Sequence, residues 1–177
     1  MLILQQYNEK IVKYDLLNKF KYNNVKNIPK LKYILLNFTF KNREIKNLIP
    51  ILGALKLITF QNSKITKSKI SNIVFKIRKG NPVGCKVTLR KNKMNKILFS
   101  LISETLPTFK YNKLNNSNIF LFKINNSLIF NELENNYQFF KKLPSLLIYI
   151  KFSECSFKEF ICLIQSYKLI NNKITQM

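Results

Sequence analysis

Residues 75–90, FKIRKGNPVGCKVTLR, decide how the rest of this chain is organised. Apolar and cationic residues alternate at both ends of the stretch, which predicts two β-strands joined by a short loop. Pro82 fixes its φ at about −65°, and Gly80 and Gly84 can adopt positive φ values, so the loop should hold a defined shape. We expect a rigid hairpin that presents a row of cations from one face, which suits a polyanion.

The chain is strongly basic but not disordered. Its 177 residues carry 31 Lys and Arg against 8 Asp and Glu, a net charge of +23, and 46% of its residues are hydrophobic. This length and apolar content predict one domain with a hydrophobic core. Such a charge excess repels itself unless a partner neutralises it, and nucleic acid or an anionic membrane is the usual partner. A solvated lysine-rich surface without a partner stays open as an alternative.

Residue types that support catalysis or metal binding are scarce. The chain has no His and a single aspartate, Asp15, so no Ser/His/Asp or Cys/His arrangement and no zinc set is predicted. Glu132 and Glu134 are expected to be surface loop residues rather than an acid/base pair. The cysteines are expected to be small buried hydrophobes in a reducing compartment; they are Cys85, Cys155 and Cys162. We therefore expect no enzyme activity, no catalytic residue, no cofactor and no metal.

Hydrophobic periodicity predicts strands mixed with helices. Strands are expected at 31–40, 64–66, 119–124, 128–130 and 146–152, and exposed loops at 108–118 and 132–144. Helices are expected at 5–20 with Ile11, Tyr14 and Leu17 on one face, at 48–57 with Asn47 as N-cap, from Met94 to before Pro107, and after the capping box of Ser156 and Glu159. Phe75, Phe157 and Phe160 are placed on core faces. The pattern predicts an α+β two-layer domain over 1–177, with a mostly antiparallel sheet packed against helices.

Several strings, taken in order, resemble the ribosomal protein L5 family of the large subunit. They are YNNV at 22–25, IP at 28–29, ILLN at 34–37, ITK at 65–67, FKIR at 75–78, Gly80, PVGCKVTLR at 82–90 and Met94. The similarity is dense from about residue 7 to 107, and beyond it only the order of the elements matches. The resemblance implies an α+β fold that binds rRNA in the central protuberance, including 5S rRNA where it is present.

The resemblance also implies roles for particular residues. The implied rRNA contacts are Asn37, Thr66, Lys67, Lys86, Thr88 and Arg90. The loop implied to approach the T-loop of P-site tRNA contains Arg78, Lys79, Gly80, Asn81, Pro82 and Gly84. The loop after Pro107 is implied to bridge to a protein of the small-subunit head, and 115–118, NNSN, replaces the glycine-rich stretch usual there. Neighbouring ribosomal proteins are further expected partners. No membrane partner is expected.

The amino-acid usage of the chain indicates its compartment. Asn, Lys, Ile, Phe and Tyr, which have AT-rich codons, are heavily used, and the first ten residues, MLILQQYNEK, resemble neither a signal peptide nor a transit sequence. We expect an organelle-encoded protein of the mitochondrial ribosome in the matrix. A plastid or the cytoplasm of an AT-rich bacterium is the alternative.

Two other classes of function compete with this one. A peripheral protein could bind anionic membranes through its lysine-rich helices, although no apolar run approaches the ~18 residues of a spanning helix. An RNA-modifying enzyme is disfavoured because no acid/base pair or cofactor loop is recognisable.

Overall fold

The structure is a computed structural model that describes residues 2–39, 48–75, 77–105, 112–115, 118–167 and 169. The α-helices are α1 (Leu2–Tyr7), α2 (Lys13–Lys19), α3 (Leu48–Thr59), α4 (Lys91–Ser100), α5 (Asn131–Glu134), α6 (Tyr137–Phe140) and α7 (Phe157–Ser166). The strands are β1 (Leu31–Thr39), β2 (Lys64–Lys67), β3 (Pro82–Leu89), β4 (Asn112–Asn115), β5 (Ile119–Ile124) and β6 (Leu146–Phe152). Shorter turns are the π-helical η1 (Asn8–Val12) and η4 (Leu101–Thr105) and the 3₁₀ η2 (Val25–Asn27) and η6 (Ser127–Ile129).

The strands form one six-stranded sheet in the order β2-β3-β1-β6-β5-β4. β2 and β3 are antiparallel neighbours. β1 and β6 are interior strands, and buried residues alternate with less buried ones along both, as in a sheet with one covered face. This architecture confirms the predicted α+β class.

The described chain divides into two compact units. The first combines the described parts of 1–34, 90–121 and 150–177, and the second those of 35–89 and 122–149. Each unit therefore joins stretches that are distant in sequence. The single domain expected over 1–177 stays a prediction.

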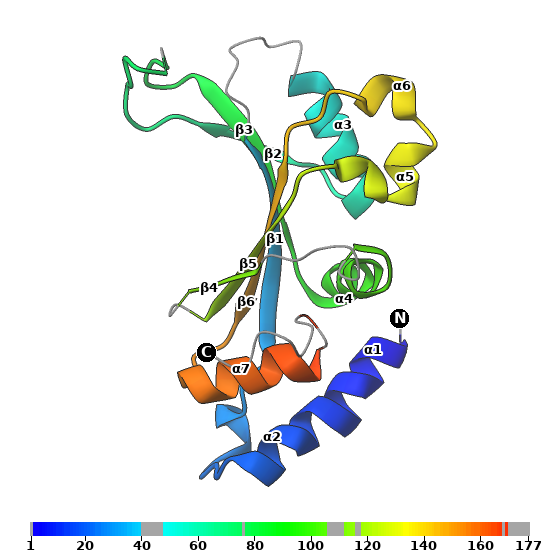
Figure 1. The fold of residues 1–177 in the computed structure, drawn as a ribbon. Helices are drawn as coiled ribbons and strands as arrows, with labels where there is room; N and C mark the ends of the chain where they lie inside the picture. The colour runs from blue at the N-terminus through cyan, green and yellow to red at the C-terminus, as the bar shows by residue number, and fades with distance from the viewer. Residues whose placement is uncertain are drawn as a thin grey trace. The chain divides into compact units, whose positions relative to one another are not determined.

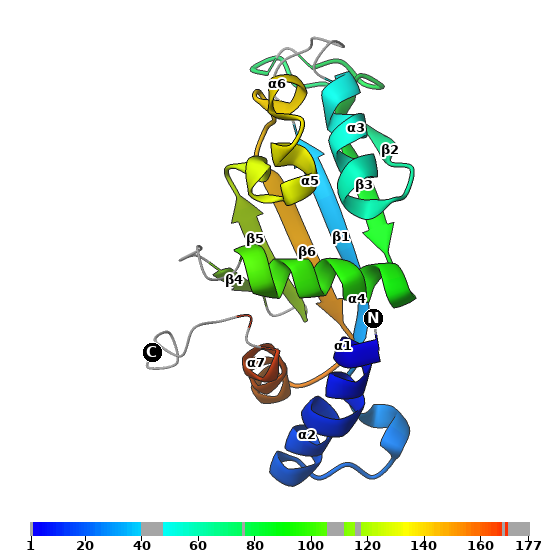
Figure 2. The ribbon, with the colours of Figure 1, turned by 90° about the vertical axis from the view of Figure 1, so that its right-hand side faces the viewer.

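In the second unit, helices gather on one side of the strands. Figure 1 and Figure 2 show α3, α5 and α6 on the same side. Beneath them the strands bury Leu36 and Phe38 of β1 and Cys85 and Val87 of β3. Burying each large apolar side chain contributes about 1.5–3 kcal/mol, so this layer decides which face of the strands stays open.

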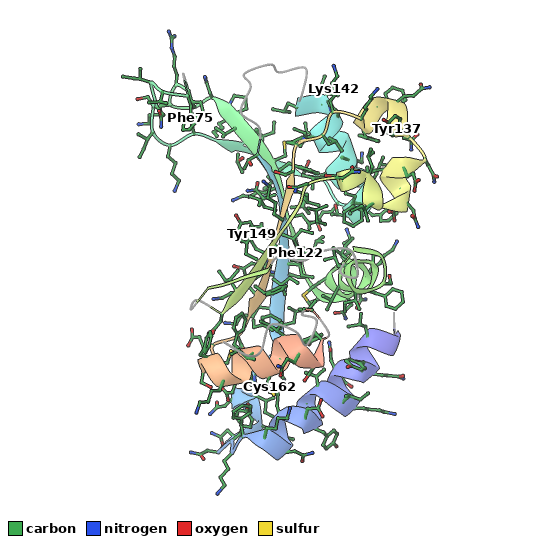
Figure 3. The ribbon with its side chains drawn as sticks, viewed as in Figure 1. Phe75, Phe122, Tyr137, Lys142, Tyr149 and Cys162 are labelled. Atoms are coloured by element: carbon green, nitrogen blue, oxygen red, sulfur yellow. The ribbon has the colours of Figure 1, made fainter. Side chains whose placement is uncertain are left out.

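In the first unit, α7 is fastened at both ends. Its capping box is formed as predicted: Ser156 Oγ accepts a hydrogen bond from the Glu159 N–H, and the Glu159 carboxylate accepts one from the Ser156 N–H at 2.7 Å. At the other end, the Tyr7 hydroxyl donates to the Ser166 carbonyl at 2.7 Å. Lys19 of α2 donates to Cys162 at 3.3 Å, and Figure 3 shows Cys162 on the side of α7 that faces α2.

The central hairpin differs from the prediction. Phe75, Ile77 and Arg78 do not form a strand: Phe75 lies in a turn and is 58% exposed, and Ile77 makes only an isolated bridge with Asn72. β3 pairs instead with β2, so the connection is a loop of fourteen residues, 68–81. The alternation FKIR is a sound strand pattern, but it has no apolar surface to pack against. Lys76, one of the expected cations, lies outside the described residues.

The N-terminal helix forms at 2–19 but buries a different face from the one predicted. Val12 and Leu16 are buried, whereas Ile11, Tyr14 and Leu17 are exposed. The buried face is set by the neighbours of this helix, because α7 contacts both η1 and α2.

Most other predicted elements are confirmed, and several boundaries change. The strand expected at 128–130 is the 3₁₀ turn η6, and the loop expected at 132–144 contains α5 and α6, so Glu132 and Glu134 are helical. The described part of the loop expected at 108–118 includes β4. Phe160 is buried as predicted, but Phe157 is 51% exposed. Asn47 and Pro107 lie outside the described residues.

Candidate nucleic-acid interface

The open face of the second unit lies opposite its helices. Cys85, Val87 and Leu89 are buried, so the alternate residues of β3, Lys86 and Thr88, point to the other face. The same argument applies to β1, where Leu36 and Phe38 are buried and Asn37 is half-buried between them. The strand register therefore brings three of the predicted rRNA-binding residues, Asn37, Lys86 and Thr88, to one face.

The pairing of β2 with β3 adds residues to that face. Thr66 lies directly opposite Gly84, and Lys64 lies directly opposite Lys86. Directly opposed residues of antiparallel strands share a face, with Cβ atoms about 4.5–5.5 Å apart. We call Asn37, Lys64, Thr66, Lys86 and Thr88 the open-face cluster. Lys64 was not predicted, because only the strand register reveals it.

The pair of opposed lysines carries an electrostatic cost. Like charges placed directly across a strand pair destabilise it, by up to about 1 kcal/mol. Both Lys64 and Lys86 are exposed, so their ammonium groups can reach an anion in front of the sheet. An anion that bridges them would remove the repulsion. The edge of the sheet is therefore better suited to a bound polyanion than to bare solvent.

Asn37 brings an unpaired polar atom to the cluster. Its Oδ1 atom is buried and has no hydrogen-bond partner among the described residues. Leaving a buried acceptor unpaired costs about 1–3 kcal/mol.

Gly84 explains how the strands approach so closely. A Cβ atom at this position would lie 2.1 Å from the backbone oxygen of Phe38 and 3.2 Å from Thr66 Oγ1. Gly84 does not use the positive φ that glycine can adopt; among the three glycines only Gly80 has one, at 89°. Gly84 is buried within β3, and Pro82 begins the same strand. These two predicted loop residues therefore belong to the strand that carries the cluster.

The loop 68–81 is closed by hydrogen bonds near its base. Ser68 N–H donates to the Asn81 carbonyl at 2.9 Å, and Gly80 N–H donates to the Ser68 carbonyl at 3.0 Å. Arg78, Lys79, Gly80 and Asn81 surround this closure, and the first three are exposed. A bulge separates Thr66 from Lys67, which is exposed beside the loop.

The far end of the loop is apolar and exposed. A second rung joins Asn72 to Ile77 by two backbone hydrogen bonds of 2.8 and 2.9 Å. Beyond it, Ile73 is 93% exposed and Val74 84% exposed. Ile70 and Phe75 are exposed as well, and Figure 3 shows Phe75 on the loop that projects from β2 and β3. We call these four residues the loop tip; sequence analysis missed them because it placed 75–78 in a strand.

Arg90 is positioned in the first unit. It follows β3 as the N-cap residue of α4, with an extended φ of −138° and no side-chain cap hydrogen bond. Its guanidinium carbon lies 5.9 Å from the centroid of the Tyr33 ring on β1, within cation–π range. The planar guanidinium is thereby held for a forked contact with phosphate oxygens. Tyr33 is a supporting residue that the sequence did not identify.

The cysteines of the chain are free and two of them are poor nucleophiles. Burial raises the pKa of the Cys85 thiol to about 11 and that of Cys155 to about 11, so neither is an activated nucleophile at neutral pH. All three cysteines are free. Within the described ranges, no group of three or more His, Cys, Asp or Glu could hold a metal ion. No described helix is long and apolar enough to cross a membrane.

The chain is similar in sequence to known proteins over most of its length. The family model for the C-terminus of the ribosomal L5 protein family matches residues 82–169. The chain is 33% identical to the large ribosomal subunit protein uL5m of Reclinomonas americana over 178 residues, which covers 96% of this chain and 98% of that protein.

Bacterial relatives match a shorter part. The large ribosomal subunit protein uL5 of Geotalea uraniireducens is 40% identical over 103 residues, and that of Aquifex pyrophilus is 38% identical over 110 residues. These alignments cover 57% and 61% of this chain, and 57% and 58% of the two bacterial proteins. The chain thus aligns with less than two thirds of each bacterial relative's length.

Proposed function

This chain belongs to the uL5 family of large-subunit ribosomal proteins, and on that premise we propose that its open-face cluster binds ribosomal RNA. As a uL5 protein it is a structural component of the large subunit rather than an enzyme. The chain is similar to uL5m over 96% of its length, which identifies it as a protein of the mitochondrial ribosome.

The observation that carries the proposal is the opposed pair Lys64 and Lys86. The pair is unfavourable in the free protein and favourable when a phosphate bridges it. Asn37 and Thr88 lie on the same face and offer groups that bind a 2′-hydroxyl or a base edge in a shallow groove or unstacked strand. Thr66 offers a further hydroxyl beside Gly84. Lys67 and Arg90 extend the phosphate contacts, and the stacking of Arg90 on Tyr33 limits its rotamers.

The loop between β2 and β3 is proposed to approach P-site tRNA. Arg78, Lys79, Gly80 and Asn81 would meet the backbone of the T-loop. The strongly exposed loop tip supports a role in contact with a partner. Removing four large apolar side chains from water lowers the free energy of the complex relative to the free protein. Pro82 and Gly84 would act indirectly, by fixing where β3 begins and how closely it approaches β1.

Further partners follow from the family and are also proposals. They are rRNA of the central protuberance, 5S rRNA in a ribosome that contains it, and neighbouring ribosomal proteins. The proposed bridge to a small-subunit head protein uses the loop after Pro107, of which 106–111 and 116–117 lie outside the described residues.

The test compares two triple variants. Lys64→Gln, Lys86→Gln and Arg90→Gln together should weaken binding to an rRNA fragment and reduce the slope of log affinity against log salt by about 2–3, because each lost phosphate contact removes about 0.7–0.9. Lys56→Gln, Lys142→Gln and Lys158→Gln remove the same charge from exposed positions on helices or beside them. Equal losses in the two variants would mean that net charge, and not the position of Lys64, Lys86 and Arg90, drives binding.

The membrane alternative is tested with the same proteins. Flotation with vesicles of phosphatidylcholine and phosphatidylserine should leave the wild-type chain in the pellet fraction once rRNA is present. Flotation that persists in excess rRNA would favour the peripheral membrane protein instead.

A further inference from the structure

A polar cavity lies in the first unit. Its volume is about 670 Å³, and it lies between η1 and α2, the segment 28–31, the start of α4 and Tyr167. Ligand pockets commonly measure about 300–1,000 Å³, whereas packed interiors contain few voids larger than a water molecule. The space is therefore large enough for a ligand the size of a nucleotide.

Two amide oxygens in the cavity wall are unpaired. Asn8 and Asn95 both line the space, and the Oδ1 atom of each is buried without a hydrogen-bond partner among the described residues. Buried polar groups are usually hydrogen-bonded. An amide offers an acceptor and two donors, so the two asparagines together could pair with the edge of a nucleobase.

Cations lie around the same cavity. Lys13, Lys30 and Lys91 line it against one acid, Glu9. Lys91 also has a φ of 52°, in the left-handed region that a lysine adopts at a cost. Such strained residues cluster at ligand sites, where the surrounding structure holds them in place.

Part of the cavity lining is apolar. Val12, Leu16, Ile28 and Met94 line it and are buried. A flat base can lie against such side chains while its edge meets the amides and its phosphate meets the lysines. A purely apolar peptide side chain would leave the amide oxygens unpaired, and a bare phosphate would leave the apolar lining exposed to water.

We propose that this cavity binds one unstacked nucleotide of the bound RNA, with the base held by Asn8 and Asn95 and the phosphate by the surrounding lysines. The inference rests on the proposed rRNA binding, but it names a site separate from the open-face cluster. Proteins that recognise RNA often use unstacked bases of loops and bulges in this way. Free mononucleotides share the chemistry and are the competing source of the ligand.

The experiment uses the full chain with Asn8→Leu and Asn95→Leu combined. These substitutions keep the number of side-chain heavy atoms and the branching at Cγ but remove the amides, and unfolding by urea should show a protein at least as stable as wild type. Asn18→Leu is the matched control, because Asn18 is exposed on α2. Affinity for an rRNA fragment with unpaired loop nucleotides should fall about tenfold in the double variant and stay unchanged in the control. Cross-linking of 4-thiouridine-substituted rRNA should label peptides that contain 8–16 or 91–95 in wild type, and this label should be lost in the double variant.

Each other outcome overturns the inference in a distinguishable way. Wild-type protein that binds no rRNA would remove the proposed function and this site with it. Wild-type binding that the double variant retains in full, without cross-links to the lining peptides, would remove the cavity site alone. Binding of free AMP or UMP that the double variant loses, while its rRNA affinity is unchanged, would make the cavity a site for free nucleotides.

Discussion

Replacing Gly84 by alanine should destabilise the protein more than either equivalent change at the other two glycines. The added Cβ would lie 2.1 Å from the Phe38 backbone oxygen, whereas real Cβ contacts essentially never fall below 3.0 Å. β3 and β1 must therefore move apart locally by at least 0.9 Å, the difference between these distances. The obstacle is backbone, which cannot rotate away as a side chain can.

The size of the effect follows from what that movement disturbs. Overpacking of a well-packed region costs about 1–3 kcal/mol, and a weakened ladder hydrogen bond adds about 1 kcal/mol. We expect Gly84→Ala to lower the free energy of unfolding by about 2–4 kcal/mol. For a chain of this size, the midpoint of thermal unfolding should fall by roughly 5–15 °C.

The other two glycines serve as controls because their surroundings differ. Gly53 lies inside α3 with its nearest contact at 3.7 Å, on the Phe140 ring, so alanine there should stabilise the helix by about 0.5–1 kcal/mol. Gly80 has open space but a φ of 89°, so alanine there should cost about 1–2 kcal/mol through backbone strain. Urea unfolding followed by circular dichroism ranks the three variants. If Gly84→Ala proved as stable as wild type, the close approach of β3 and β1 would be wrong.

Three further predictions concern charge, pH and the loop tip. Without RNA and at low salt, Lys64→Gln with Lys86→Gln should raise stability by about 0.2–1 kcal/mol, and a gain that does not shrink when salt is added to the urea titration would contradict repulsion between the pair. Burial raises the pKa of the Glu159 carboxyl, but the nearby Tyr22 hydroxyl and the hydrogen bonds from Ser156 outweigh it and hold that pKa below its ordinary value of 4.5. Its contribution to stability is therefore full above about pH 5 and lost as the pH falls through the folded pKa, so the advantage of wild type over Glu159→Gln should shrink on acidification; a constant difference between pH 7 and 3 would refute this. Ile73→Ser with Val74→Ser should change stability by less than about 0.5 kcal/mol because both side chains are exposed, while weakening P-site tRNA binding to reconstituted ribosomes; unchanged tRNA binding would exclude the tip from that contact.

Local sequence signals predicted elements whose stability comes from nearby residues. The capping box of Ser156 and Glu159 starts α7 where expected, because the two residues satisfy each other's backbone groups. β1 and β6 form where their apolar runs predict strands, and buried residues alternate with less buried ones along both because one face is covered. The chain around Phe75 shows the limit, because a strand pattern with no surface to pack against becomes an exposed loop.

Some residues of the candidate site were predicted from the sequence, and others were found only in the structure. The chain's charge and the string at 82–90 predicted the cationic strand β3 and its residues Lys86 and Thr88, because alternation alone places them on one face. That Lys64 opposes Lys86 is a consequence of strand register, which depends on residues twenty-two positions apart. The unpaired amide oxygens of Asn8 and Asn95 likewise exist only because distant helices meet.

The sequence by itself determined the fold class, the basic strand and the capping box of Ser156 and Glu159, since these depend on interactions between residues close in the chain. Only the tertiary structure decided which face of the N-terminal helix is buried and why Gly84 must lack a side chain. The physical reason is that burial and close backbone approach are set by neighbours from other elements. At Gly84 that neighbour is the carbonyl oxygen of Phe38, which no local pattern reveals.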